Sequence, residues 1–244
     1  IVLNGKEYTI DTLSMYPVGP GTTFYELRML RVDAVSRLDC WLLAIDTRDP
    51  YVSVEQVLGT GKIIGTERPS KMAERSTTEN KIFFAGSNGD FFVTQGDVGL
   101  PTNTTIVNKE YAHTPAGVGA SRRLGCIDAD GRGATAYYHS VSMQLVLSDT
   151  TLKIAHANYK RLDNELVLYN IHNGANTGTN AYGTEVQIQL LPGQDWNTTG
   201  TMKAKVTKVE DQVGSMPLDK DHAVLSGHGT MAVELNKLKV GEHK

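Results

Sequence analysis

The sequence contains few cysteines and few aromatic residues, and it lacks a strong net charge and long apolar runs. Two cysteines, Cys40 and Cys126, are too few for a disulfide scaffold or a thiolate zinc cluster, and whether they pair is left open. The 24 basic and 27 acidic residues nearly balance, so we expect no surface for nucleic acid or anionic membrane. The longest apolar stretches, such as residues 82–85, are too short for a bilayer, which predicts no transmembrane segment.

Most of the sequence has the patterns of β-strands. Residues 22–33 alternate with a period near two, and residues 40–45 form a continuous apolar run typical of a strand buried on both faces. Turn residues separate the other expected strands, which are residues 51–58, 81–86, 125–127, 134–138, 141–147, 152–155, 165–169, 185–191, 202–209 and 222–226. Helices are expected at residues 69–79 and 230–239.

These elements predict an α+β fold that is β-rich, with mostly antiparallel strands and few short helices. Its 244 residues are enough for one sizeable core or two small ones. No linker clearly divides the chain, so we expect one unit over residues 21–244, preceded by a small N-terminal appendage at residues 1–20.

Familiar metal and hydrolase motifs are missing or incomplete. A calcium loop counted from Asp128 has Gly133 at its sixth position, but His139 stands at the twelfth position, where a bidentate Glu is required. An Asp-Gly hairpin turn is therefore favoured there. The seven histidines form no His-x-His or His-Glu-x-x-His pattern, and no Gly-x-Ser-x-Gly elbow occurs. We therefore predict no metal site from motifs, while the cofactor stays open.

A glycine-rich loop, Ser226-Gly227-His228-Gly229-Thr230, is expected between a strand and a helix. A helix N-terminus offers unpaired N–H groups that suit a phosphate, and Gly227 and Gly229 would let a ligand approach the backbone. His228 could donate to an oxyanion or protonate a leaving group. The alternative is an ordinary turn in which Thr230 caps the helix.

A second turn segment, Asn88-Gly89-Asp90-Phe91-Phe92, follows an apolar run directly. Asn-Gly favours positive φ and a sharp turn, so Asn88 and Asp90 would be displayed while the two phenylalanines anchor the chain again. Such rigid display suits a binding site. A purely structural hairpin turn is the alternative.

This second segment, taken from Phe83 to Phe92, resembles the apolar-strand and Asn-Gly segment of phosphodiester glycosidase domains. Residues 158–170, 177–186 and 223–229 are similar to later segments of that family, in the same order and with similar spacing. The family's Arg-Thr-Ala-x-Gly and Asp-Gly-Gly-Gly-Ser motifs are absent. The chain therefore resembles the N-terminal portion of such a domain, with residues 21–244 covered and a C-terminal half of the same protein as the expected partner.

The resemblance implies hydrolysis of a sugar-1-phosphodiester at its glycosidic bond, in an exported or envelope-associated bacterial protein. It implies a carbohydrate phosphodiester as substrate. We expect Asn88, Gly89 and Asp90 near the sugar, with Asp90 and His228 as catalytic candidates and Gly227 and Gly229 holding the phosphate.

Glu165 and Glu185 are further substrate-binding candidates. Glu185 shares a strand face with Gln187 and Gln189, so the alternation favours solvent exposure for its side chain. The competing hypothesis is a non-catalytic, exported glycan-binding or structural module that uses loops such as residues 173–180.

Overall fold

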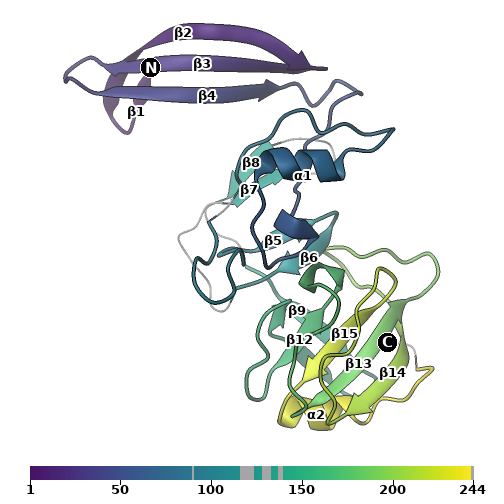
Figure 1. The fold of residues 1–244 in the computed structure, drawn as a ribbon. Coiled ribbons are helices and arrows are strands. Elements are labelled where there is room, and N and C mark those ends of the chain that lie inside the picture. The colour runs from purple at the N-terminus through teal and green to yellow at the C-terminus, as the bar shows by residue number, and fades with distance from the viewer. Residues whose placement is uncertain (90, 116–123, 128–132, 137–139, 243–244) are drawn as a thin grey trace. The chain divides into compact units, whose positions relative to one another are not determined.

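The structure of the chain is a computed structural model, and it describes residues 1–89, 91–115, 124–127, 133–136 and 140–242 (Figure 1). Strands dominate, most neighbouring strands are antiparallel, and the described residues contain two α-helices. The β-rich expectation is thus confirmed. The chain divides into two compact units. The first contains Ile1–Glu55, Thr77–Gly86 and Gly125–Ala134, and the second contains Gln56–Ser76, Ser87–Leu124 and Thr135–Lys244.

The first unit contains an antiparallel four-stranded sheet in the order β1-β2-β3-β4. Its strands are β1 (Val2–Leu3), β2 (Lys6–Gly19), β3 (Thr22–Arg31) and β4 (Arg37–Ile45). β2 pairs with β3 from Tyr8 opposite Arg31 to Gly19 opposite Thr22. The expected boundary after residue 20 therefore lies inside a hairpin, and residues 1–20 share a sheet with residues 22–45 instead of forming an appendage.

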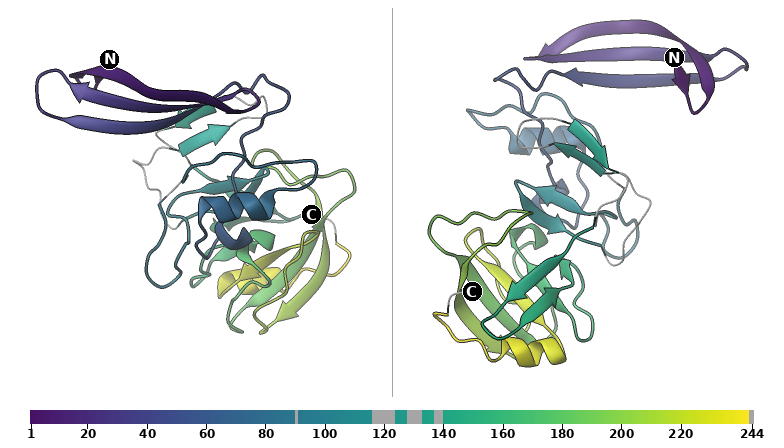
Figure 2. Two further views of the ribbon diagram at one scale, coloured as in Figure 1. Left: turned by 45° about the horizontal axis from the view of Figure 1, so that its top comes forward. Right: turned by 180° about the vertical axis from the view of Figure 1, so that it is seen from behind.

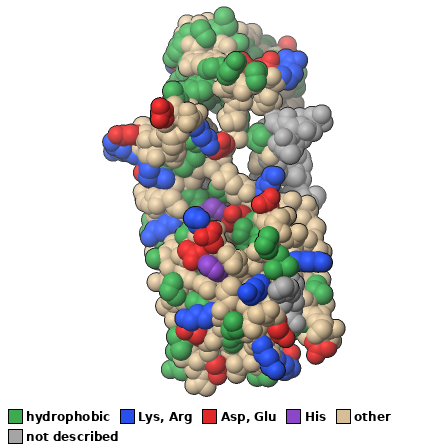
Figure 3. Space-filling model, turned by 90° about the vertical axis from the view of Figure 1, so that its right-hand side faces the viewer, with side chains coloured by type: hydrophobic (Ala, Val, Ile, Leu, Met, Phe, Trp, Pro, Cys, Tyr) green, Lys and Arg blue, Asp and Glu red, His purple; other side chains and the backbone are tan. Residues whose placement is uncertain are grey.

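One face of this sheet carries an apolar row across its three long strands. Met15, Tyr25 and Leu42 lie opposite one another, because β2 and β4 both pair with β3. Met15 is 61% exposed and Leu42 is 49% exposed. The expectation that residues 40–45 are buried on both faces is wrong, and Trp41 is 69% exposed. The space-filling view shows hydrophobic side chains on the surface of this sheet, at the top of Figure 3.

The second unit is built on a five-stranded sheet in the order β11-β12-β15-β13-β14 (Figure 2). Its strands are β11 (His156–Ala157), β12 (Leu166–Tyr169), β15 (Ala223–Gly227), β13 (Thr184–Leu190) and β14 (Ala204–Asp211). β11 and β12 are parallel, and the remaining pairs are antiparallel. The last strand in the chain, β15, therefore lies at the centre of the sheet.

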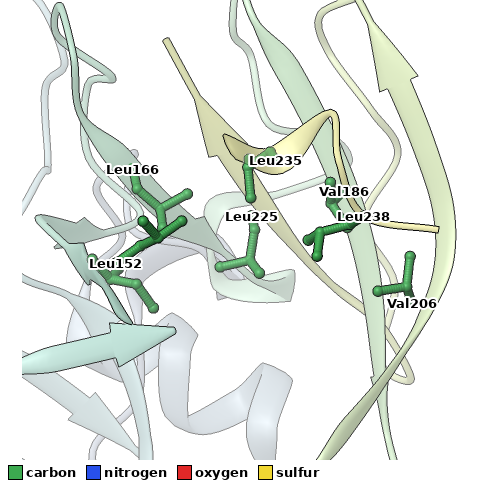
Figure 4. Close-up of a cluster of buried hydrophobic side chains, with 8 residues drawn as sticks. Leu152, Leu166, Val186, Val206, Leu225, Leu235 and Leu238 are labelled. Carbon is green, nitrogen blue, oxygen red and sulfur yellow. The ribbon is translucent and has the colours of Figure 1, made fainter. Parts of the chain in front are cut away.

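One face of this sheet packs on helix α2 (Thr230–Leu235) and on the hairpin of β9 (Met143–Val146) and β10 (Thr151–Ile154). Figure 4 shows this core, in which Leu166, Leu225 and Val186 from three neighbouring strands face Leu235 of the helix. Leu166 and Leu235 are completely buried. At roughly 1.5–3 kcal/mol for each buried aliphatic side chain, this cluster is a main source of the unit's stability.

The opposite face of the sheet is covered by the segment that connects β14 to β15. Met216 and Leu218 of this segment pack against Val167, Tyr169 and Val224. The polar residues Glu185 and Ser226 share this face, where they lie opposite each other in the register of β13 and β15. The segment therefore buries Glu185, which the sequence pattern assigned to solvent, while Gln189 farther along β13 is exposed.

The remaining elements are short. They are the hairpin of β5 (Thr105–Val107) and β6 (Glu110–His113), the pair β7 (Leu124–Ile127) and β8 (Gly133–Ala136), helix α1 (Pro69–Ser76), and the 3₁₀ turns Gly59–Gly61 and Ile171–Asn173. β5 and β6 contribute Val107 and Ala112 to a second small core with Leu58, Ile63 and Leu100. The hairpin turn predicted from Asp128 to Gly131 lies outside the described residues.

Two expected strands are not formed. Residues 52–58 are irregular and end in the 3₁₀ turn, and residues 82–86 have no strand pairing. Ile82 is 69% exposed, so the expected buried strand before Asn88 is wrong. Composition alone cannot supply a neighbouring strand, and an apolar run without one stays irregular.

Candidate functional site

A pocket of about 430 Å³ opens in the second unit, where residues that follow β11, the last residue of β12 and the loop before β13 contribute to its wall. Its wall combines apolar, aromatic, amide, hydroxyl and charged side chains. They are Ile63, Ile64, Asp97, Leu100, Asn158, Tyr159, Lys160, Arg161, Leu162, Tyr169, Asn173, Thr177, Gly178, Thr179 and Asn180. A volume of this size and a mixed lining are typical of sites for small molecules.

The carboxylate of Glu185 lies behind the pocket wall and is completely buried. Its Oε1 accepts hydrogen bonds from the hydroxyls of Thr179 and Ser226, both at 2.8 Å. Its Oε2 accepts from the Met216 backbone N–H at 2.8 Å and from the Thr177 hydroxyl at 3.2 Å. Four donors compensate the buried charge, and through the two threonines they fix the 177–180 loop against the sheet.

Arg161 reaches the same network from the opposite side of Ser226. Its Nη1 donates to the Ser226 hydroxyl at 2.7 Å, and its Nη2 donates to the backbone O and side-chain Oδ1 of Asn180 at 3.0 and 2.8 Å. Burial lowers the pKa of the guanidinium, and the nearby charge of Glu185 opposes this shift. The side chain stays a half-buried cation that lines the pocket.

Asn158 immediately follows β11 and is the first of five consecutive residues that line the pocket. Its φ of +48° is in the left-handed region, which Asn tolerates better than most residues. The buried side chain donates to the Ala112 carbonyl and to Asn170, and it accepts from the Asn170 backbone N–H. Nearby, the Tyr169 hydroxyl donates to the Tyr159 carbonyl at 2.6 Å, and burial raises the pKa of this phenol.

Two glycines make the close approaches that the network requires. A Cβ on Gly183 would lie 2.7 Å from Nη1 of Arg161 and would also collide with the Gly227 carbonyl. A Cβ on Gly214 would collide with the carbonyls of Thr179 and Asn180. The bare backbone at these two positions therefore lets the guanidinium reach Ser226 and lets the 177–180 loop pack on the segment after β14.

Two backbone donors at the predicted phosphate loop of Gly227, His228 and Gly229 are already engaged. The His228 N–H donates to the Glu165 carbonyl, and the Thr230 N–H donates to Oδ1 of Asn164. Gly229, with φ of +55°, is the N-cap residue, so Thr230 is not the cap. A Cβ on Gly227 would meet the Met231 carbonyl at 2.8 Å, which explains this glycine by helix packing.

Glu165 lies beside His228 of this loop, and neither residue lines the pocket. Nδ1 of His228 is 3.3 Å from Asp163, and Nε2 of His156 is 3.9 Å from Glu165. Burial lowers the pKa of His156, and the charge of Glu165 opposes that shift. The structure thus pairs two carboxylates of the segment before β12 with histidines.

Asn88 and Gly89 are exposed, and neither has the positive φ that an Asn-Gly turn favours. The one hydrogen bond to either residue within the described part of the chain comes from the Ser87 hydroxyl to the Asn88 carbonyl. Phe91 is exposed rather than anchored, and Asp90 lies outside the described residues. The structure gives no contact between Asn88 or Gly89 and the described residues of the 227–229 loop.

Both candidate carboxylates in the described residues contact the pocket wall: Glu185 accepts from the hydroxyls of Thr177 and Thr179, and Glu165 accepts from the Leu162 N–H. The expectation that Glu185 faces solvent is wrong. Sequence reasoning missed Arg161. A single arginine in a loop forms no motif, although it lies inside the 158–170 segment that carries part of the family resemblance.

Metal clusters and membrane-spanning helices are both absent from the described residues. These residues contain no cluster of three or more His, Cys, Asp or Glu side chains arranged to hold a metal ion. Neither of their helices has the length and apolar character needed to cross a bilayer.

Comparisons with known proteins identify the fold alone. No family model matches the sequence, and no curated protein matches it. A hypothetical protein from Synechocystis matches the structure with a TM-score of 0.59 at 14% identity, over 98% of this chain and 45% of that one. A protein from Burkholderia pseudomallei K96243, designated "Putative exported protein", matches with a TM-score of 0.58 at 13% identity, over 99% of this chain and 68% of that one. The chain thus shares its fold with both and spans less than half of the Synechocystis protein.

Proposed function

We propose that this chain belongs to an enzyme that hydrolyses a sugar-1-phosphodiester at the glycosidic bond. One observation carries the proposal. Arg161, Thr179 with Glu185, and Ser226 come from three separate segments that resemble phosphodiester glycosidases, and they form one hydrogen-bonded network at the pocket. Segments that are about 20 to 65 residues apart in the sequence therefore build a single site.

The reaction adds water across the bond between C1 of the sugar and the phosphodiester oxygen. The C1–O bond breaks, the water oxygen bonds to C1, and the bridging oxygen leaves with the phosphate monoester. One proton of the water goes to a base. Because a phosphate monoester is a stable anion, the reaction depends more on water activation and on stabilising oxocarbenium-like charge than on protonation of the leaving group.

The residues divide into three proposed roles. The amides and hydroxyls of Asn173, Asn180 and Thr179 line the pocket and suit sugar hydroxyls. Glu185 holds the wall, since both of its carboxylate oxygens already accept hydrogen bonds. Asp90 and His228 stay the catalytic candidates, with Asn88 and Gly89 assigned to the sugar by the motif resemblance.

The proposed setting is outside the cytoplasm, in the periplasm, the cell envelope or the medium. The exported designation of the Burkholderia structure supports it. We also propose that further sequence completes the site, because this chain covers 45% and 68% of the two structures that share its fold.

The decisive experiment is hydrolysis of a synthetic N-acetylglucosamine 1-(methyl phosphodiester) in ¹⁸O-labelled water. The assay should use both this chain and a longer chain that spans the length of the structural neighbours. Glycosidic cleavage puts the label in the sugar and releases unlabelled methyl phosphate. Label in the phosphate would mean P–O cleavage and would overturn the proposal.

The catalytic candidates are tested in whichever chain is active. Asp90→Asn and His228→Ala should lower turnover at least about 100-fold, the usual scale for losing an acid–base group. The urea unfolding midpoint should stay unchanged. His222→Ala is the matched control, because His222 pairs with Asp219 and does not line the pocket. Full activity in both catalytic variants would remove Asp90 and His228 from the mechanism.

A glycan-binding module without turnover is the second candidate function. Its supporting observation is the pocket lining, in which Tyr159 and several amides could hold a sugar by stacking and hydrogen bonds. If the longer chain binds a sugar phosphodiester but releases no free sugar, this alternative is favoured.

A further inference from the structure

We propose that the Arg161 guanidinium is the group that binds the phosphate of the ligand in this pocket. That the ligand is a sugar phosphodiester rests on the proposed function, whereas the anion site itself rests on the structure. The first observation is an unbalanced cation. Arg161 lines the pocket, is half-buried, and has no carboxylate within ion-pair distance among the described residues.

Glu185 is close enough to influence Arg161, but it does not neutralise it directly. Ser226 lies between them, accepting from Nη1 of Arg161 and donating to Oε1 of Glu185. Glu185 is occupied by three other donors as well. A partly desolvated cation without a contacting anion is costly, so the arrangement favours an anionic ligand.

The existing hydrogen bonds hold the guanidinium and leave donors free. Nη1 and Nη2 are fixed by Ser226 and Asn180, whereas Nε–H has no recorded acceptor among the described residues. A guanidinium carries five N–H groups in one plane, so Nε–H and the second N–H of Nη1 remain for phosphate oxygens. Because Gly183 leaves room for Nη1, the plane is set before the ligand arrives.

The other cation of the pocket is less suited to this role. Lys160 is exposed, and its Nζ lies 3.4 Å from Asp97, which also lines the pocket. An exposed lysine that is paired with a carboxylate adds little net attraction in water. Lys160 would therefore contribute at the rim of the pocket, while Arg161 makes the direct contact.

The 227–229 loop, where the sequence predicted the phosphate, is a weaker candidate. Helix α2 has six residues, and its Thr230 N–H is already bound by Asn164. The His228 N–H is bound by the Glu165 carbonyl. The positive charge available to a phosphate is thus that of Arg161, which binds the Ser226 hydroxyl just before this loop.

The test measures binding of inorganic phosphate and glucose 1-phosphate to the purified chain by ³¹P NMR titration. Arg161→Gln should weaken both about 10- to 100-fold, as expected for loss of a charge-assisted hydrogen-bonding pair. Arg161→Lys should lose less. Arg68→Gln is the matched control, since Arg68 is an exposed arginine of the same unit and does not line the pocket. Equal affinities in Arg161→Gln and the unmodified chain, or no binding to the latter, would overturn the proposal.

A second measurement needs no variant and so cannot fail through misfolding. Phosphate should slow the reaction of Arg161 with phenylglyoxal, followed by peptide mass spectrometry, and should leave the rate at Arg68 unchanged. Equal rates at Arg161 with and without phosphate would contradict the site.

Arg161-dependent phosphate binding without diester hydrolysis would refute the proposed function alone. Hydrolysis that survives Arg161→Gln with unchanged KM would refute the anion site alone.

Discussion

Glu185 is a charged residue in the middle of a strand, and its burial depends on four donors from different parts of the chain. The alternation of Glu185, Gln187 and Gln189 predicted the strand and the shared face correctly, but it placed that face in solvent. What covers the face is the segment containing Met216, about 30 residues later in the sequence. A two-residue period carries no information about such a distant partner.

Removing the Glu185 carboxylate should therefore destabilise the second unit. Glu185→Ala leaves buried donors without an acceptor, and we expect a loss of about 3 kcal/mol in the free energy of unfolding. Glu185→Gln keeps one acceptor oxygen and should lose less. Urea denaturation followed by circular dichroism measures both. Glu210→Gln is the control, because Glu210 lies opposite Glu185 on β14 but pairs with Lys208 near the surface. Equal stability of Glu185→Ala and the control would mean that the network contributes nothing.

His156 should make stability depend on pH. Burial holds its pKa below the ordinary value of 6.5 in the folded chain. As the pH falls below about 6.5, the unfolded chain takes up a proton that the folded chain still lacks, so the free energy of unfolding decreases. We expect a lower urea midpoint at pH 5.5 than at pH 7.5, and a smaller difference in His156→Asn. A His156→Asn variant with the full pH difference would assign the effect elsewhere.

At the scale of elements, the strands of the second unit were predictable because each combines β-branched residues with flanking turn residues. β9, β10, β12, β13, β14 and β15 all lie within a few residues of their expected ranges. Helix α1 was predictable from Pro69 and the helix formers that follow it. Residues 82–86 have a similar composition to a strand but lack a partner, so the pattern alone was misleading.

The junction between β15 and α2 gives a prediction about glycine. Gly229 has φ of +55°, and a Cβ there would collide with Oδ1 of Asn164, the atom that binds the Thr230 N–H. With ψ of −122°, Gly229 has a backbone conformation that residues with a side chain rarely adopt, and the collision adds to that strain, so Gly229→Ala should cost more than about 1 kcal/mol. Gly193→Ala is the control, because its φ is +80° and its Cβ would meet nothing within 4 Å. Chemical denaturation compares the two, and equal losses would contradict a packing role for Gly229.

At the scale of the molecule, the composition predicted a β-rich chain, but not where it divides. The first unit combines Ile1–Glu55 with the distant segments Thr77–Gly86 and Gly125–Ala134, and no shift in composition along the sequence marks either unit. The sequence also did not predict that residues 158–170, 177–186 and 223–229 lie close together in the fold. The resemblance suggested their order along the chain, and only the sheet order β12-β15-β13 brings them together.

The N-terminal sheet should bind hydrophobic probes. Met15, Tyr25 and Leu42 form a row of neighbouring apolar side chains, two of them about half exposed or more. The double variant Met15→Lys, Leu42→Lys should lower anilinonaphthalene sulfonate fluorescence severalfold with little loss of stability, because exposed side chains contribute little to the core. Val233→Lys, on the exposed face of α2, is the control. Unchanged fluorescence in the double variant would mean that this row is not accessible.

The central position of β15 has a consequence for synthesis on the ribosome. β12 and β13 emerge first, but neither can pair with the other, because the gap between them belongs to residues 223–227. Until those residues appear, Leu166 and Val186 lack the neighbour that buries them, and Arg161 lacks its anchor on Ser226. A nascent chain that stops before residue 223 should therefore be a target for chaperones and proteases, and ligand binding should begin only once β15 has been made.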